Sequence, residues 1–407
     1  MSQFVTTQII EGVIMKNILK KTENKILIIL LLFSISIGLW NNFRQLWMQD
    51  NGLDPTQISK ILSFGTLFCV IGILIFSKYI KLDKIKKFIT VALLIKIINL
   101  IMLFFINNTS FGAFINLSII IDIIIERLII ISIYPLIVTI KKSNTLYSKR
   151  KLVEYTGRDL GVLIGGFVIG KTILGIVFNY NLCLLISIIF SIVSLIILLN
   201  VKIENVETKT SNQNIFKYTF TNKLRTTYLL YYLVGQIAYF TALGLKMLTL
   251  TNYLNFTDSG ATKYFLIIGI FADIIGIVAL KFLTPKNDYI TITIKFGIRL
   301  IGYALAFFSN NIIVVICAMS WSLLISTAYE NITDAPYINS IDLDKQLAFT
   351  NLRYMVGSLG EAIGTFLCGI MYSIGLRYIF GLSAFFMLAQ LTLAYILINQ
   401  RRKLNIK

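Results

Sequence analysis

The stretch Leu117–Pro135, LSIIIDIIIERLIIISIYP, is built almost entirely from isoleucine and leucine, yet it carries Asp122, Glu126 and Arg127 near its middle. Its length is close to the roughly 20 apolar residues that cross a bilayer core as a helix. Each charge would cost about 2.5–3.5 kcal/mol at the centre of a helix that faces lipid. We therefore expect a membrane-spanning helix whose charged side chains face other helices.

The whole chain shares this apolar character. Of its 407 residues, 57% are hydrophobic and 14% are charged, whereas a soluble protein has about 25% charged residues. The sequence therefore predicts an all-α polytopic membrane protein with twelve transmembrane helices. The twelve apolar segments are 26–48, 57–79, 87–107, 112–140, 154–178, 181–201, 226–250, 261–283, 289–309, 311–337, 349–373 and 377–398.

One long hydrophilic connection divides the chain near its midpoint. We expect a tail at 1–25, a six-helix bundle at 26–201, a loop at 202–225, a second six-helix bundle at 226–398 and a tail at 399–407. One set of alternate connections carries 27 lysines and arginines, and the opposite set carries four. Because basic residues mark the cytoplasmic side, both termini and the central loop are expected to be cytoplasmic.

Several residue types are missing or isolated. The chain has no histidine, which excludes HExxH zinc sites and histidine general bases. The four cysteines lie apart in apolar segments, so we expect neither disulfides nor a metal site. No nucleotide-binding GxxxxGK[ST] pattern occurs, and we expect no enzyme and no cofactor. The net charge of +19 is assigned to cytoplasmic loops and not to nucleic-acid binding. No cleavable signal peptide is expected, and Met15 offers an alternative start.

Several features recur at about half the chain length. The glycines of GVLIGGFVIG recur in GEAIGTFLCG at an offset of 199 residues. Glu126 and Glu330 are 204 residues apart, as are Asp54 and Asp258. Many transporters are built from such internal repeats. The repeat therefore predicts two pseudo-symmetric halves of six helices each.

These patterns resemble the major facilitator superfamily over the whole chain. The stretch GRDLGVLIGG at 157–166 is similar to the family's helix 5 pattern GxxxGPxxGG, with Val162 in place of the proline. The stretch YIKLDKIKK is similar to the family's loop between helices 2 and 3, and the matching residues are Asp83, Lys84 and Lys87. On helix 4, Arg127 matches the arginine of the family's RxxxG motif. The resemblance implies a twelve-helix transporter fold.

In this family fold, helices 5 and 11 lie at the seam between the halves, where alternating access needs close, sliding contact. Small residues four apart leave a groove for a neighbouring backbone. The glycines expected to form the seam are Gly157, Gly161, Gly165, Gly166, Gly360 and Gly364. We expect Arg158, Asp159 and Glu361 to form a charged cluster beside them. The alternative is ordinary tight packing with no moving part.

The family fold also implies a central cavity lined by helices 1, 4, 7 and 10. Asp122 and Glu126 are four residues apart and share one helix face. Two carboxyls in one poorly hydrated site do not both ionise readily, so one of them, first Glu126, is expected to carry a coupling proton. Arg127 is its expected switchable counter-ion, and Glu330 and Glu361 are further candidates. The alternative is a fixed ion-pair network that only braces the helices.

Polar and aromatic side chains on helices 1 and 7 are candidates for contacts with a substrate. Amides within an apolar helix need hydrogen-bond partners. The candidates are Asn41, Asn42, Tyr232, Gln236 and Tyr239.

The sequence as a whole predicts a secondary active transporter of the cell membrane that moves a small molecule by alternating access. Proton-coupled efflux by antiport is the first expectation, with the proton gradient as the energy source. Proton-coupled nutrient uptake is the alternative, since Val162 replaces the proline of the antiporter pattern. A non-transporting membrane scaffold or sensor is the second alternative. The expected partners are a small molecule of unknown class and the lipid bilayer, and the expected functional unit is a monomer.

Overall fold

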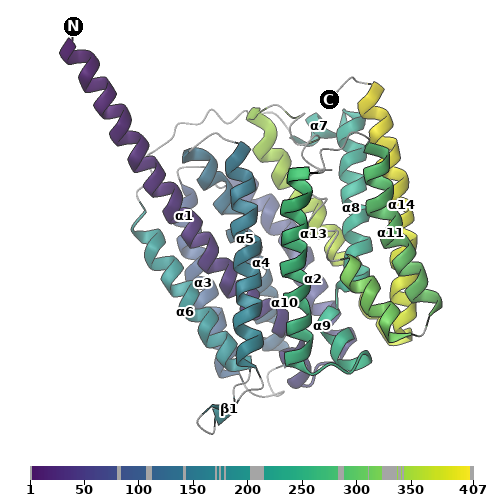
Figure 1. The fold of residues 1–407 in the computed structure, drawn as a ribbon. Helices are drawn as coiled ribbons and strands as arrows, with labels where there is room; N and C mark the ends of the chain where they lie inside the picture. The colour runs from purple at the N-terminus through teal and green to yellow at the C-terminus, as the bar shows by residue number, and fades with distance from the viewer. Residues whose placement is uncertain are drawn as a thin grey trace.

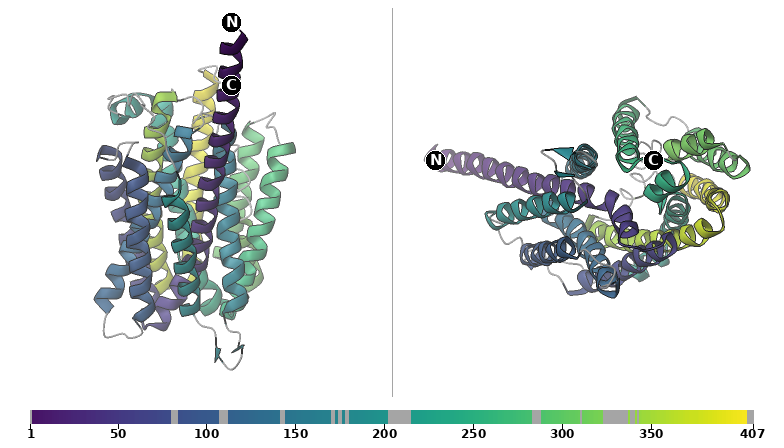
Figure 2. Two further views of the ribbon diagram at one scale, coloured as in Figure 1. Left: turned by 90° about the vertical axis from the view of Figure 1, so that its left-hand side faces the viewer. Right: turned by 90° about the horizontal axis from the view of Figure 1, so that it is seen from below.

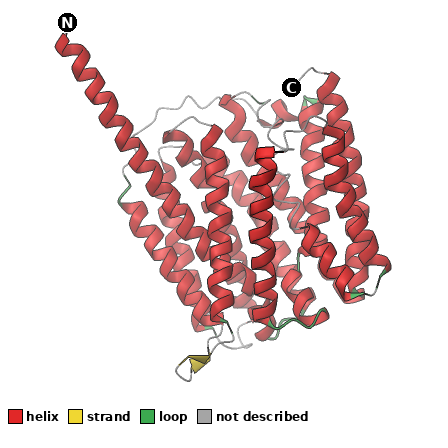
Figure 3. Cartoon of the chain, viewed as in Figure 1, coloured by secondary structure: helices red, strands yellow, loops and turns green. Residues whose placement is uncertain are grey.

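The computed structural model describes residues 2–79, 84–106, 112–140, 144–169, 172–173, 176–177, 180–201, 215–282, 288–309, 311–322, 337, 341 and 343–403. Within these residues the protein is almost entirely helical (Figure 3). Asp83 and Glu330, both named above, lie outside the described residues, as does the stretch 202–214 of the expected central loop.

The first half of the chain forms long helices in the expected order. They are α1 (Ser2–Asp50), α2 (Pro55–Tyr79), α3 (Ile85–Phe105), α4 (Gly112–Ile140), α5 (Asn144–Val168) and α6 (Tyr180–Leu199). An antiparallel hairpin of β1 (Thr172–Ile173) and β2 (Ile176–Val177) precedes α6. The beginning of α2 is fixed by a capping box, in which the side chains of Asp54 and Gln57 each accept the other's backbone N–H at 2.9 and 3.1 Å.

The N-terminal helix is longer than the segment 26–48 that hydropathy predicts. Helical structure extends back to Ser2, and this extension projects well beyond the rest of the bundle (Figure 1). The expected tail at 1–25 is therefore mostly a continuation of α1.

The second half is also helical, but one span is interrupted. Its described elements are α7 (Ile215–Phe220), α8 (Lys223–Leu243), α9 (Lys246–Leu248), the π-helical turn η3 (Thr249–Tyr253), α10 (Asp258–Phe282), α11 (Asp288–Phe308), a helix at Ile312–Ser322, α13 (Leu343–Ile374) and α14 (Leu376–Lys403). The apolar segment at 226–250 is thus divided between α8, α9 and η3, because the regular helix ends before Gly244.

The distribution of polar and apolar side chains is that of a multi-pass membrane protein. Seven of the described helices are long and apolar enough to cross a membrane. Phe105 and Phe308 are among the most exposed large side chains, whereas Lys96 and Arg150 are fully buried. In a soluble protein, by contrast, charged side chains cover the outer surface, and a lysine is almost never buried completely. Here lipid is the solvent of the outer face.

The helices form two groups, one from each half of the chain. The helix ends of both groups lie at the same two ends of the molecule (Figure 1). Within the first half α1 packs on α4, α5 and α6, and within the second half α8 packs on α13 and α14. The halves meet mainly where α2 packs on α13 and where α5 packs on α10. The N- and C-termini and α7 lie at one end, and the β1–β2 hairpin lies at the other (Figures 1 and 2).

The glycines expected at the seam between halves mostly pack inside one half. A Cβ atom on Gly157 would lie 2.8 Å from the carbonyl oxygen of Leu31 in α1, and one on Gly161 would collide with the same helix. Gly165 lies against the ring of Phe43, also on α1. Only Gly166 of this group packs on the other half, where its Cβ would lie 2.7 Å from Thr262.

The second half repeats this arrangement. A Cβ on Gly360 would lie 2.7 Å from the carbonyl oxygen of Leu233, and one on Gly364 would lie 2.7 Å from that of Ile237, both on α8. α5 and α13 do contact the other half, as expected, but five of the six glycines lie on the face that packs on α1 or α8 of the same half. The equivalent packing supports the predicted pseudo-symmetry of the two halves.

Candidate functional site

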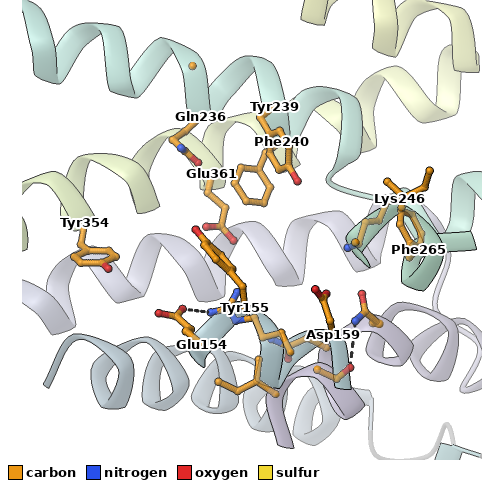
Figure 4. Close-up of a pocket in the computed structure, with 18 of the residues that line it drawn as sticks. Glu154, Tyr155, Asp159, Gln236, Tyr239, Phe240, Lys246, Phe265, Tyr354 and Glu361 are labelled. Carbon is orange, nitrogen blue, oxygen red and sulfur yellow. Dashed lines mark hydrogen bonds and ion pairs between the residues drawn. The ribbon is translucent and has the colours of Figure 1, made fainter. Parts of the chain in front are cut away.

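A cavity of about 450 Å³ lies between the two halves. Its walls come from α1, α4 and α5 of the first half and from α8, α9, α10, α11, α13 and α14 of the second. The volume is within the range of about 300–1,000 Å³ that is typical of small-molecule sites. Figure 4 shows side chains from both halves pointing into this space.

The side chains predicted to contact a substrate all line this cavity. Asn41 and Asn42 of α1 lie on one wall, and the three residues from α8 lie on the other: Tyr232, Gln236 and Tyr239. The ring of Tyr232 is covered by the guanidinium of Arg353, 4.4 Å from its centre. The sequence pattern thus placed five polar or aromatic groups on the cavity wall.

An ion pair joins the halves at the cavity. The guanidinium of Arg127 on α4 donates a hydrogen bond to the carboxylate of Glu361 on α13. Both side chains are partly exposed to the cavity, by 29% and 16%. The expected cluster of Glu361 with Arg158 does not form, since Arg158 pairs with Glu154 one turn earlier on α5, at 2.8 Å.

Glu126 lies behind the cavity wall and touches it through an amide. It is 5% exposed, and the Asn41 side chain donates to its two carboxylate oxygens at 2.8 and 2.9 Å. The carbonyl oxygen of the same amide is buried without a hydrogen-bond partner. Asn41 therefore lies between the cavity and the Glu126 carboxyl. The described hydrogen bonds of this carboxyl come from the neutral Asn41 amide.

Asp122 is held in a separate, fully buried network. Its carboxylate accepts hydrogen bonds from the ammonium of Lys96 at 2.9 Å and from the indole of Trp40 at 3.0 Å. Arg44 lies 3.5 Å away. Because Asp122 is absent from the cavity wall and both it and Lys96 are 0% exposed, this site has the form of a fixed ion-pair network.

The first half contributes a second internal network on α5. Arg150 is fully buried, donates to the carbonyl oxygen of Ile130 at 3.1 Å and lies 3.7 Å from Glu154. Arg158 completes this i, i+4 series from the other side of Glu154. Asp159, the next residue, faces the cavity with its carboxylate against Gly269 of α10.

At the helix break in the second half, two residues that were not predicted as site residues lie between the halves. They are Gln45 and Lys246. Between α8 and α9 the backbone leaves the regular helical path, with Leu245 at φ −113° and ψ 38°. Gln45 from α1 donates to the carbonyl oxygen of Gly244 at 2.8 Å and accepts the N–H of Met247 at 3.3 Å. Lys246, inside the break, lines the cavity. Hydropathy treats this stretch as continuous helix and cannot locate the break.

Further basic side chains of the second half line the cavity. Lys295 and Arg299 on α11 and Arg353 on α13 are each 4–6% exposed. Arg299 donates to the carbonyl oxygen of Ser322 at 2.8 Å. Sequence reasoning assigned these residues no cavity role. Lys295 and Arg299 are spaced four apart on an apolar helix, which is the sequence signal that could have identified them.

The remaining predicted residues lie away from the cavity. Lys84 occupies the N-cap position of α3, and both it and Lys87 are exposed. Neither contributes to the cavity wall. Among the described residues, no group of three or more cysteine, aspartate or glutamate side chains could hold a metal ion.

The fold is shared with solved transporter structures. The chain superimposes on a POT family transporter in complex with 5-aminolevulinic acid with a TM-score of 0.70 at 13% identity, covering 94% of this chain and 96% of that one. A mutant form of the nucleoside transporter NupG gives a TM-score of 0.69 at 13% identity, covering 92% and 99%. A D-xylose–proton symporter gives 0.68 at 11% identity, covering 91% and 96%.

Sequence comparison adds no relative. No protein-family model matches the chain, and no match is found among curated proteins. At 11–13% identity the structural likeness shows the fold alone, which the chain shares with these solved transporter structures. The predicted fold of two pseudo-symmetric helical halves is confirmed.

Proposed function

We propose that this multi-pass membrane protein is a proton-coupled secondary transporter that moves a small molecule by alternating access. The observation that carries the proposal is the ion pair between Arg127 and Glu361, which connects the two halves at the cavity between them. An ion pair across a moving interface must break when the halves separate, so its protonation state is coupled to the conformation of the protein.

The charge count around this pair supports proton coupling. Arg127 has a carboxylate partner across the interface in Glu361 and a second one nearby on its own helix in Glu126. One guanidinium therefore serves two carboxyls, and a proton on either one leaves Arg127 to pair with the other. Cys69 lies within electrostatic range of both acids, of Arg127 and of Arg44.

A transport cycle follows from this arrangement. When Glu361 gains a proton, Arg127 pairs with Glu126, the contact between α4 and α13 is lost, and the halves are free to move apart at the cavity. When Glu361 loses the proton, Arg127 returns to it. Asn41 holds the Glu126 carboxylate in place through the two hydrogen bonds that its amide nitrogen donates.

Export by proton antiport is the first candidate direction, because of the glycine pattern of helix 5. Proton-coupled uptake is the second, and the charge of the cavity favours it. Among the described wall residues six are basic and three are acidic. A negative substrate that enters a cell moves against the membrane potential, at about 2.3 kcal/mol per charge per 100 mV, and an accompanying proton removes that cost.

We place the protein in the cell membrane as a monomer, with both termini cytoplasmic. The basic residues of alternate connections support this orientation. In a variant without native cysteines, a reagent that does not cross membranes should label Lys263→Cys in intact cells. It should label Lys403→Cys only after permeabilisation, and the opposite pattern would reverse the orientation.

Transport and coupling are tested separately in vesicles. Wild type is loaded into proteoliposomes, and a compound panel is screened for exchange across the membrane without a gradient and for accumulation driven by ΔpH. Glu361→Gln removes the titrating group and should retain exchange but lose accumulation. Asp54→Asn, at an exposed carboxyl before α2 whose capping oxygen asparagine retains, is the matched control and should retain both.

The direction follows from the sign of the gradient that drives accumulation. Antiport requires an acidic compartment on the side where substrate accumulates, and symport requires it on the opposite side. If no compound exchanges in the wild type and Glu361→Gln only lowers thermal stability, the protein is a scaffold or sensor and the proposal fails.

A further inference from the structure

Lys246 differs in its surroundings from two other cations of the cavity wall, Arg127 and Arg158. Arg127 and Arg158 each bind a carboxylate. Lys246 instead lies 4.6 Å from the centre of the Phe265 ring. No described residue accepts a hydrogen bond from its ammonium, and Asp159 is the nearest acid that attracts it. Figure 4 shows the ammonium directed toward the part of the cavity beside Asp159.

The position of Lys246 is fixed by backbone that does not depend on its charge. The break between α8 and α9 turns this residue into the cavity, and Gln45 holds the break from the other half. Phe265 of α10 supports the methylene chain and the ammonium by a cation–π contact. Because α1, α9 and α10 all contribute to its position, the Lys246 side chain keeps its ammonium in place before a ligand binds.

A cation so placed favours an anionic ligand. Lys246 is half-buried in the cavity wall, and an ammonium that has lost part of its hydration gains from nearby negative charge and hydrogen-bond acceptors. Asp159 supplies charge to Lys246 but no hydrogen bond in this conformation. The acids Glu154 and Glu361 are already held by Arg158 and Arg127, so two of the three described acids on the wall do not compete for Lys246.

We infer that Lys246 is an anion-binding subsite and that the transported molecule is a small organic anion whose carboxylate or phosphate binds there. This inference rests on the proposed transport function. The excess of basic over acidic residues among the described wall residues acts in the same direction, because it raises the local concentration of anions in the cavity.

Other groups of the same cavity wall define the rest of the ligand. Phe240 and Phe265 offer apolar surface, and Gln236 and Asn42 offer amide groups that both donate and accept hydrogen bonds. The ligand therefore has a compact body with an apolar or planar face and hydroxyl or amide groups, and one end carries the negative charge.

The test uses purified full-length protein and pairs of compounds that differ in the anionic group. The phosphate pairs are glucose 6-phosphate with glucose and uridine monophosphate with uridine, and the carboxylate pairs are glutamate with glutamine and 4-hydroxyphenylacetate with its amide. Binding is measured as thermal stabilisation in detergent micelles. The variants are Lys246→Met, which removes the charge, and Lys246→Arg, which retains it. Lys263→Met, on the exposed surface of α10, is the control.

At least one anion should stabilise the wild type at millimolar concentration, and its neutral counterpart should not. Lys246→Met should raise the Kd of that anion by about ten- to a hundredfold, the loss expected for one charge-assisted hydrogen bond. Lys246→Arg and the control should remain near the wild-type value. The pair that responds decides between carboxylate and phosphate.

Three results would overturn the inference: no anion of the panel binds, neutral and anionic members bind alike, or Lys246→Met binds the anion as the wild type does. The thermal transition of each variant reports whether it is folded. If a neutral compound is exchanged in proteoliposomes, the inference fails and the transport function stands. If an anion binds through Lys246 but nothing is exchanged, the transport function fails instead.

Discussion

Asp122 and Glu126 are one helical turn apart on α4, yet their surroundings are opposite. Asp122 is in contact with Lys96, Arg44 and the indole of Trp40, so its negative charge is balanced on several sides. Glu126 receives its described hydrogen bonds from a neutral amide. Asp122 is therefore suited to brace α1, α3 and α4, whereas the described hydrogen bonds of Glu126 connect it to α1 alone.

Neutralising Asp122 should destabilise the protein strongly. Asp122→Asn leaves Lys96 buried without its carboxylate, and breaking a buried ion pair in this way costs about 3–5 kcal/mol. Unfolding in mixed micelles measures the change. Lys60→Met, on an exposed position of α2, provides a neutral reference. Retention of wild-type stability by Asp122→Asn would mean that the network does not brace the helices.

The sequence could predict which residues of α4 share a face, but not what faces them. The spacing of Asp122 and Glu126 predicts one face because the helical repeat alone determines it. Lys96 comes from α3, and Glu361 is 234 residues away from its partner Arg127. Such pairings depend on how whole helices are placed, and a single sequence contains no direct signal of that.

At the scale of elements, glycine spacing sets how closely helices approach. α5 lies against α1 and α13 lies against α8 with almost no space for a Cβ atom at the contact. The glycine pattern correctly indicates close helix packing, as small residues do in membranes. It does not indicate the neighbour, because a groove on one helix fits any helix that presents a smooth backbone.

Replacing one of these glycines with alanine should lower the stability of the protein, and the loss should be larger where the added Cβ atom lies closer to its neighbour. In Gly360→Ala the new methyl group would lie 2.7 Å from the carbonyl oxygen of Leu233, and overpacking of this kind costs about 1–3 kcal/mol. Gly297→Ala on α11 is the matched control, since its Cβ meets nothing closer than 4.0 Å. That control should be neutral or stabilising, by up to about 1 kcal/mol. Equal thermal stability of the two variants would contradict the packing described here.

At the scale of the molecule, the contacts between halves are unevenly distributed. Hydrogen bonds with described residues on both sides occur at the cavity or toward the end opposite the termini. Besides those of Gln45, that end has Gln49 donating to Asn252 at 3.3 Å and Tyr180 donating to Asp258. These hydrogen bonds join the halves at that end, which we call the closed end.

Joining the halves at the closed end should stop transport. A short bifunctional reagent applied to Gln49→Cys with Asn252→Cys should cross-link the pair, and exchange in proteoliposomes should then cease. A cleavable reagent should restore exchange after reduction. Each single cysteine variant serves as the control. Continued exchange by the cross-linked protein would show that this end does not open during the cycle.

The hydrogen bonds between Gln45 of α1 and the helix break contribute to the stability of the closed end. Two backbone groups bind Gln45, and each such hydrogen bond contributes about 0.5–1.5 kcal/mol net. Opening would exchange both for water, so these two hydrogen bonds alone favour the joined arrangement by a factor of about 5 to 150. A free-energy difference of this size is one that the binding of a single small molecule can supply.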